Sequence, residues 1–168
     1  FGKVLKKVVY DELLHDVSPV LSNAQHDFLP RRSCVTNLAT YLHHAWTSIS
    51  DGCQTDAIYT DFTAAFQSVN HRLLIFKLQN SYHISDNVLD WFKSYLSDRE
   101  QRVVVNGKTS DWRAVTSGVP EGALLAPLLF ALYINDLPMA VKSSHCVMFA
   151  DDVKLYRRVR TPLDCEEL

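Results

Sequence analysis

Three aspartates combine a residue type and a placement that could support metal-dependent chemistry. Asp61 ends a β-prone run, and the adjacent pair Asp151 and Asp152 lies between two further β-prone runs. Two neighbouring ionised carboxylates repel each other, and a protein tolerates such a pair where cations neutralise it. Carboxylate oxygens suit Mg²⁺, which usually takes one or two protein carboxylates together with phosphate oxygens and water. Two such ions could activate an attacking hydroxyl and stabilise a leaving pyrophosphate in nucleotidyl transfer.

The same three residues also have an ordinary structural interpretation. Asp is a common turn residue, so a pair of aspartates between two strands is in most proteins a solvated turn. A single Asp at the end of a strand, such as Asp61, is usually a cap. The carboxylates alone therefore leave the catalytic and the structural interpretation open.

The segments around the aspartates predict the strands that would bring them together. Residues 57–59 predict a short buried strand that ends at Asp61, followed by a tight bend and helical character from Ala64 onward. Residues 144–149 and 153–156 predict a hairpin with the aspartate pair at its tip. Side chains can converge at a turn, so the tip can face an acid delivered by a neighbouring strand. Asp61 is the natural candidate for that acid.

The remaining segments alternate between helical and β-prone patterns without a regular βαβ rhythm. The apolar residues predict helices over residues 4–17, 34–49, 87–96 and 124–134. Ser33 and Ser85 are expected to cap the second and third helices, and Pro127 fits the fourth only in its first turn. Asn106-Gly107 between two β-prone runs (102–105 and 111–115) predicts a second hairpin, because both residues tolerate positive φ. The pattern favours an α+β fold with a small antiparallel sheet.

Composition narrows the class of protein. With 168 residues, 47% of them hydrophobic and 21% charged, the chain fits one folded domain or a piece of a larger one. It contains no apolar run near the ~20 residues of a membrane helix and no secretory signal, so we expect an intracellular protein that does not contact membranes. The four cysteines lack C-x-x-C spacing, which argues against a zinc site or a disulfide framework.

The charge balance bears on nucleic-acid binding. A formal net charge of −2 argues against a free-standing nucleic-acid binder, because Lys and Arg normally supply most of the nonspecific affinity for phosphates. Basic residues do cluster locally, among them Arg31 with Arg32 and the group that includes Arg102. These clusters are either a basic stripe on a neutral body or solvated surface charges.

Five ordered segments carry a resemblance to a known family. They read FADD at Phe149 to Asp152, DFTAAFQSVNH from Asp61, GVPEG from Gly118, QHDFLPRRS from Gln25 and PLLFALYINDLP from Pro127. In this order they resemble the motifs of the reverse transcriptase domain of non-LTR (LINE-type) retrotransposons. The resemblance implies a polymerase palm with a small antiparallel sheet packed on helices, plus part of the fingers. It places the fingers-side helices and loop at about residues 1–55, and the palm, with a fingers-side helix insertion, at about residues 56–168.

The resemblance also implies an activity and its residues. The activity is RNA-directed DNA synthesis with two Mg²⁺ ions, for which Mn²⁺ is a possible substitute. Asp61, Asp151 and Asp152 are the implied catalytic metal ligands, with the backbone carbonyl of Phe62 as a further ligand. Asp61 and Asp151 would bridge the two ions, and Asp152 would support them.

Further positions match the family's substrate contacts. Phe66 matches an aromatic ring that lies under the incoming sugar and would exclude a 2′-hydroxyl, although core packing explains the residue equally well. Glu121 and Gly122 match the nucleotide-binding segment, and Arg31, Arg32 and Arg102 are candidate nucleic-acid contacts. The implied partners are an RNA template, a DNA primer, a dNTP and the rest of a longer polyprotein that includes an endonuclease and a thumb. The family implies a location in nucleus and cytoplasm.

Several departures from the family pattern bear on activity. The family usually has Asp at the position of Gln67 and Gln at the position of Glu121. It usually has Gly at the positions of Asp27 and Arg31, and a small residue, usually Gly, at the position of Ala126. Glu121 adds a negative charge beside the triphosphate, and this set indicates a decayed copy. The chain begins after the family's R-P-I segment and ends soon after the catalytic hairpin, so we expect little or no polymerase activity from it alone.

Three alternatives remain beside an active polymerase core. The first is a decayed remnant that acts at most as a nucleic-acid-binding module. The second is an unrelated metal-dependent hydrolase that uses the same acids. The third is an intron-encoded or telomerase-like enzyme, against which the V-N-H segment after Phe66 and the Y-I-N-D-L-P run argue.

Overall fold

The computed structural model describes residues 2–120 and 122–168. The helices are Gly2–Val17 (α1), the 3-10 turn Ser18–Val20 (η1), Cys34–Ser50 (α2), His71–Asn80 (α3), Asp86–Leu96 (α4), Ala126–Ile134 (α5), Leu137–Ala140 (α6) and Pro162–Glu166 (α7). The strands are Gln54–Asp61 (β1), Glu100–Gln101 (β2), Val104–Val105 (β3), Lys108–Thr109 (β4), Arg113–Ala114 (β5), His145–Phe149 (β6) and Asp152–Val159 (β7). Helices and small antiparallel sheets confirm the predicted α+β class.

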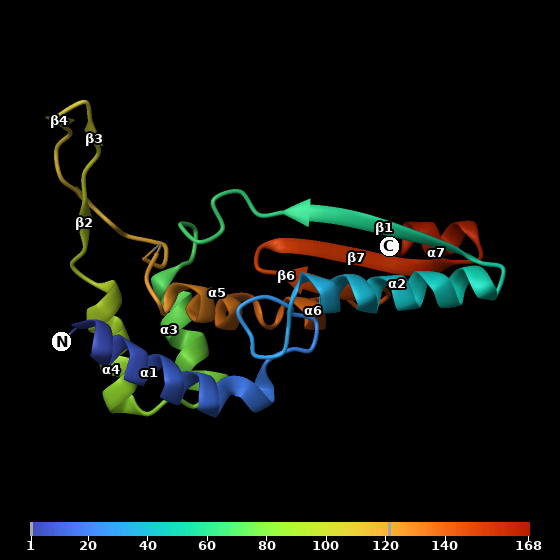
Figure 1. Cartoon of the computed structure of the whole chain (residues 1–168), viewed down its shortest axis with the longest axis horizontal. Helices are drawn as coiled ribbons and strands as arrows, with labels where there is room; N and C mark the ends of the chain where they lie inside the picture. Colours follow the sequence, from blue (N-terminus) through green and yellow to red (C-terminus); the bar gives the residue numbers. More distant parts are fainter. Residues whose placement is uncertain (1, 121) are drawn as a thin grey trace.

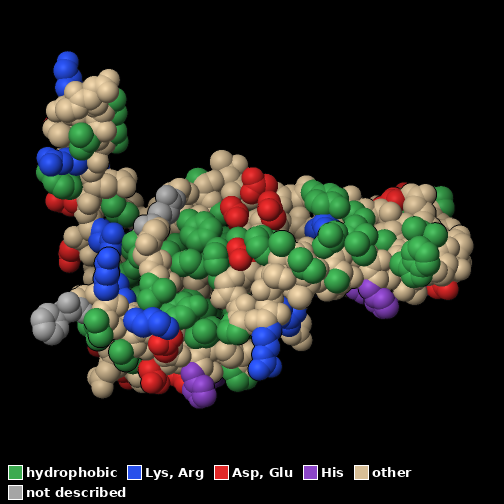
Figure 2. Space-filling view, in the orientation of Figure 1, with side chains coloured by type: hydrophobic (Ala, Val, Ile, Leu, Met, Phe, Trp, Pro, Cys, Tyr) green, Lys and Arg blue, Asp and Glu red, His purple; other side chains and the backbone are tan. Residues whose placement is uncertain are grey.

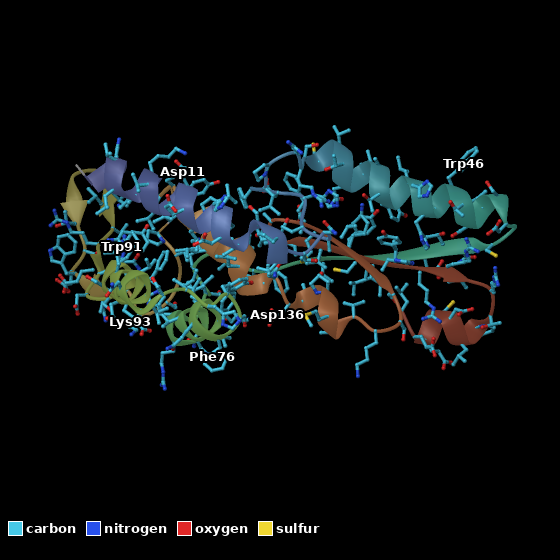
Figure 3. The ribbon with its side chains drawn as sticks, turned by 90° about the horizontal axis from the view of Figure 1, so that it is seen from below. Asp11, Trp46, Phe76, Trp91, Lys93 and Asp136 are labelled. Carbon is cyan, nitrogen blue, oxygen red and sulfur yellow. The ribbon has the colours of Figure 1, made fainter. Side chains whose placement is uncertain are left out.

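A three-stranded antiparallel sheet forms one end of the molecule. Its strand order is β1-β7-β6, so β7 is the central strand and is paired along both sides. Helix α2 lies along one face of this sheet, and α6 and α7 lie on the opposite side (Figure 3). The sheet is therefore a layer between helices.

A bundle of helices forms the other end. Helices α1, α3, α4 and α5 pack together there (Figure 1), because each contributes apolar residues at helical spacing to one core. Helix α5 is apolar nearly all round and most of its residues are buried, as the sequence predicted. Pro127 lies in the first turn of α5, where its missing N–H removes no helical hydrogen bond.

A hairpin projects from the helical bundle (Figure 1). Strands β3 and β4 flank Asn106 and Gly107, whose φ angles are +50° and +77°, so both residues occupy the left-handed region that this two-residue turn requires. The pairing of β2 with β5 and the bond from the Val115 N–H to the Arg99 carbonyl (2.8 Å) continue the hairpin toward its base. The hairpin is confirmed, and its side chains between residues 100 and 114 are exposed.

Local capping signals set several helix boundaries. The Ser33 hydroxyl accepts from the Thr36 N–H (3.3 Å) and the Thr36 hydroxyl accepts from the Ser33 N–H (2.9 Å), which completes a capping box at the start of α2. Ser85 precedes α4 as predicted but makes no capping hydrogen bond with its side chain. Among the described residues no helix combines the length and apolar character needed to cross a membrane, and the four cysteines are free.

Two predictions near Asp61 are wrong in detail. The strand is longer than residues 57–59 and is not buried; the side chains of Ile58 and Tyr59 are 43% and 67% exposed. A regular helix does not start at Ala64, whose φ of +51° lies in the left-handed region. Helix α3 starts at His71 instead, because the Asn70 side chain accepts from the Leu73 N–H (3.0 Å) and caps it.

Candidate active site

The strand register brings the three predicted acids to one end of the three-stranded sheet. Asp61, the last residue of β1, is directly opposite Asp152, the first residue of β7. Phe149 is opposite Asp152 across the β6–β7 pair, so Ala150 and Asp151 form a two-residue turn between these strands. Figure 2 shows acidic side chains gathered over the tip of β1 and the β6–β7 turn. The proximity predicted from sequence is therefore present.

The face of the sheet beside α2 carries a cavity of about 400 Å³. Directly opposite residues on an antiparallel pair share a face, so Asp61 with Asp152 and Tyr59 with Lys154 point to the same side. These four residues line the cavity, and the first turns of α2 close it with Cys34 and Asn37. The Lys154 ammonium lies 4.3 Å from the Tyr41 ring centroid and 4.9 Å from that of Tyr59, next to the acidic end of the sheet.

The acids differ in exposure. The side chains of Asp61 and Asp152 are exposed, whereas Asp151 is half-buried in the turn. Among the described residues there is no group of three or more His, Cys, Asp or Glu side chains arranged to hold a metal ion. The opposed pair Asp61 and Asp152 does match the one or two carboxylates with which proteins commonly hold Mg²⁺. The roles assigned to the three aspartates and to the Phe62 carbonyl stay predictions.

A second cavity, of about 500 Å³, lies beside Phe66. Its wall includes Tyr10, Phe28, Phe66 and Gly122. The Phe66 ring stacks on Phe130 with centroids 4.5 Å apart, and Phe28 approaches it edge-on at 6.2 Å. Phe66 therefore packs against the core, as one interpretation expected, and also lines the cavity; its contact with an incoming sugar stays a prediction.

The sequence matches known proteins over nearly its whole length. The family described as reverse transcriptase (RNA-dependent DNA polymerase) matches residues 1–165. The chain belongs to the reverse transcriptase family.

Relatives from mobile elements agree with this membership. The "Probable RNA-directed DNA polymerase from transposon BS" of Drosophila melanogaster is 30% identical over 143 residues, which is 81% of this chain and 16% of that protein. The RNA-directed DNA polymerase from mobile element jockey of the same species is 24% identical and covers 82% of the chain and 15% of that protein. The Pol polyprotein of the type-1 retrotransposable element R2 of Popillia japonica is 25% identical and covers 72% of the chain and 22% of that protein. The resemblance to non-LTR retrotransposon reverse transcriptases is confirmed, and the chain spans about 15–22% of these relatives.

Gly118 and Val119, which open the G-V-P-E-G segment of this reverse transcriptase, are held against the residues that follow β1. The Gly118 N–H donates to the Val69 carbonyl (2.8 Å), and the Val119 N–H donates to the Phe66 carbonyl (2.9 Å). Gly118 has a φ of +87°, and a Cβ there would lie 2.8 Å from the Gln67 backbone, so this position requires glycine. Gly122 has a φ of +70° with open space around it, and Glu121 lies outside the described residues.

The predicted nucleic-acid contacts occupy two separate places. Arg31 is exposed in the loop before α2, and its φ of +64° confirms that a non-glycine residue there adopts a strained conformation. Arg32 donates to the carbonyl of Asn23 (3.1 Å) and to its side-chain oxygen (2.5 Å), so this guanidinium holds the loop together. Arg102 lies on the projecting hairpin, with its guanidinium 4.6 Å from the Trp112 ring. Nucleic-acid binding by all three stays a prediction.

Asp27 adds a fourth carboxylate near the predicted centre. Burial raises the pKa of Asp27 and the negative charge of Asp151 raises it further, while the Phe28 N–H, which donates to Asp27 at 2.9 Å, opposes both effects. Asp27 itself does not have positive φ; the next residue, Phe28, does, with +58°. The departure from glycine at Asp27 therefore acts through charge, whereas the departure at Arg31 acts through backbone conformation.

Sequence reasoning missed residues that contact the site from other elements. Lys154 follows Asp152 by two positions on β7, and the two-residue period of a strand could have placed it on the same face. Asn37 donates from its side chain to the Met148 carbonyl (3.0 Å), and Gln25 reaches the β6–β7 turn. Neither residue carried a local signal for that contact, because both contacts link segments more than 100 residues apart.

Proposed function

We propose that this chain is the catalytic core of an RNA-directed DNA polymerase in which Asp61, Asp151 and Asp152 hold two Mg²⁺ ions. The observation that supports this most is the register that sets Asp61 opposite Asp152 beside the turn that contains Asp151. Reverse transcriptases use divalent metal ions, and Mn²⁺ could replace Mg²⁺ here. When bound, the ions would supply activation of the attacking hydroxyl and stabilisation of the leaving pyrophosphate. The substrates we propose are an RNA template, a DNA primer and a dNTP.

The chain's own residues would orient these substrates. Phe66 and Gly122 line one cavity, so the sugar of the incoming nucleotide would lie against the Phe66 ring while the glycine leaves room for its approach. The Phe66 ring is fixed by its stack on Phe130, which lets it exclude a 2′-hydroxyl by steric contact. Arg102 and Trp112 on the hairpin offer a cation and an aromatic face to the nucleic acid.

A test of the metal site compares stability with and without Mg²⁺. Like charges directly opposite each other on a sheet are destabilising, so without divalent ions Asp61→Asn and Asp152→Asn should each stabilise the chain by about 0.2–1 kcal/mol. Mg²⁺ should stabilise the wild type and have much less effect on either variant, because it binds the folded carboxylates. The measurement is urea unfolding in EDTA and in Mg²⁺.

The matched control is Asp90→Asn on α4, where the lost carboxylate pairs with Lys93 (2.7 Å) far from the sheet. This variant should respond to Mg²⁺ as the wild type does. An equal response to Mg²⁺ in Asp61→Asn and the wild type would contradict the proposed site.

Binding of a primer–template separates an active core from a decayed remnant. An active core should bind an RNA–DNA primer–template more tightly when Mg²⁺ and the matching dNTP are both present, as fluorescence anisotropy would show. A remnant should bind weakly, with strong salt dependence and no response to the nucleotide. The strained Arg31 and the extra charge of Asp27 favour weak or absent primer extension by this chain alone.

A further inference from the structure

Gln25 is a buried polar side chain that reaches the turn between β6 and β7. It is 1% exposed and lies 125 residues from Ala150 in the sequence. Its side-chain carbonyl accepts the Ala150 N–H at 3.1 Å, and its side-chain NH₂ donates to the Ala150 carbonyl at 3.3 Å. One side chain therefore satisfies both backbone polar groups of the residue that precedes Asp151.

The backbone around Gln25 fixes where its side chain starts. Gln25 forms a parallel bridge with Met148, in which the Met148 N–H donates to the Ala24 carbonyl (2.7 Å) and the His26 N–H donates to the Met148 carbonyl (2.9 Å). The Gln25 side-chain oxygen also accepts the N–H groups of His26 and Asp27, both at 3.0 Å. The loop before α2 thus pairs with β6 on the side away from β7. This pairing fixes the position of the Gln25 backbone, from which the side-chain amide extends toward Ala150.

The turn needs such an anchor. Ala150 has a φ of +52°, a conformation that costs a residue with a Cβ about 1 kcal/mol or more, so a free turn would relax toward other conformations. Asp151 follows directly, and the direction of its carboxylate depends on how the Ala150 peptide groups are oriented. Glutamine suits this position because an amide both donates and accepts, whereas an ionised carboxylate only accepts and the methionine thioether is a weak acceptor that cannot donate.

We propose that Gln25 is a positioning residue that holds the Ala150 turn so that the Asp151 carboxylate faces the divalent metal site. This inference rests on the proposed function for the metal site itself, and on the hydrogen bonds above for the role of Gln25. In this role Gln25 would act through the turn and not as a ligand of the ions.

The probe is Mn²⁺ alone, with binding to the 168-residue chain followed by the EPR signal of the free ion. Gln25→Met keeps the length of the side chain and removes the hydrogen bonds to Ala150. It should weaken Mn²⁺ binding about tenfold, which is the lower end of the loss in metal affinity seen when a residue that orients a metal ligand is replaced. Amide exchange of Ala150 should accelerate in the same variant. Unchanged Mn²⁺ affinity together with faster Ala150 exchange would reduce Gln25 to a structural role and overturn the proposal.

Two further variants keep the test independent of folding. Gln25→Glu is nearly isosteric and adds a negative charge near Asp151, which by Coulomb attraction alone would tighten Mn²⁺ binding. Positioning predicts weaker binding instead, because the Ala150 carbonyl loses its donor; tighter binding would overturn the proposal. Ser48→Ala also removes a fully buried hydroxyl, which donates to the His44 carbonyl (3.0 Å) away from the turn, and should leave Mn²⁺ affinity unchanged.

Asp61→Asn separates failure of this inference from failure of the proposed function. If the wild type and Asp61→Asn bind Mn²⁺ equally, the proposed metal site is wrong. The positioning role of Gln25 is then wrong as well, whatever the rate of Ala150 amide exchange. If Asp61→Asn abolishes Mn²⁺ binding and Gln25→Met leaves it intact, only the positioning role fails.

Discussion

At the scale of single residues, the choice of amino acid at Gly118 is limited by the backbone of Gln67, which approaches it from another segment of the chain. Among the described glycines, Gly118 is the one at which an added Cβ would meet other atoms within 4 Å, and those atoms are backbone of Gln67. The His71 ring donates to the Gly118 carbonyl (2.6 Å) and the Ser117 hydroxyl donates to the Gln67 carbonyl (2.9 Å). These contacts tie the loop before α5 to the loop after β1, and thereby position Phe66 beside its cavity.

Gly118→Ala should destabilise the chain by about 2–3 kcal/mol, because the substitution combines left-handed φ strain with a backbone clash. Gly52→Ala is the matched control, since Gly52 has a φ of +70° with open space and should lose only about 1 kcal/mol. The measurement is the midpoint of urea unfolding. Equal losses in the two variants would mean that the Gln67 contact contributes nothing.

At the level of elements, α2 is the helix that supports the sheet near the site. It contains no Asp, Glu, Lys or Arg, and it contacts both β1 and β6. His44 packs against His145 of β6 (ring centroids 4.4 Å) and Tyr156 of β7 (5.0 Å), and its Nε2 is buried with no hydrogen-bond partner among the residues that the structure describes. On the opposite side of α2, Trp46 is 73% exposed and points away from the sheet (Figure 3).

Acid should loosen the docking of α2. Burial lowers the pKa of His44, and the neighbouring His145, Arg158 and His43 lower it further. A histidine whose pKa is depressed by folding takes up its proton first in the unfolded chain, so its stabilising contribution is present above pH ~6.5 and is lost as the pH falls through the folded value. Stability should therefore decline from pH 7 toward pH 5.

His44→Phe keeps a ring in contact with Tyr156 and removes the titrating group, so the decline between pH 7 and pH 5 should become shallower. The buried His26, whose pKa is also lowered by burial and by Arg32, would account for the slope that remains. Chemical unfolding at a series of pH values is the measurement. An unchanged slope would show that His44 is not responsible.

The whole molecule places the acidic end of the sheet next to the helical bundle, with the hairpin projecting to one side (Figure 1). Acidic side chains gather at the end of the sheet (Figure 2), whereas Arg102 lies on the hairpin. Four exposed apolar side chains accompany Arg102 on the hairpin, namely Val103, Val104, Val105 and Trp112. A nucleic acid would meet this cationic and aromatic surface away from the acidic centre.

Arg102→Ala should weaken nucleic-acid binding and reduce the slope of log affinity against log salt by about 0.7–0.9, the change expected for one lost phosphate contact. Arg72→Ala is the matched control, because Arg72 is exposed on α3 and carries no predicted contact. Anisotropy titrations at several salt concentrations make the measurement. The same slope in both variants would exclude a phosphate contact at Arg102.

Local sequence signals were sufficient for most elements, and the ordered motifs singled out the three candidate acids. The Ser33 cap, the Asn106-Gly107 turn and the helical spacing depend on residues within a few positions of one another, and their energies are nearly the same in any fold. The exposure of Ile58 could not be predicted in this way, because it depends on which helices cover the sheet around β1.

Long-range pairing decided the rest. The register that opposes Asp61 to Asp152 and the reach of Gln25 to Ala150 join distant segments, and their positions depend on how helices and sheet pack as a whole. The sequence singled out Asp61, Asp151 and Asp152 as candidates because their residue types and motifs are local, and their metal-binding role stays a prediction. It could not show what holds Asp151 in place, because that side chain comes from another part of the fold.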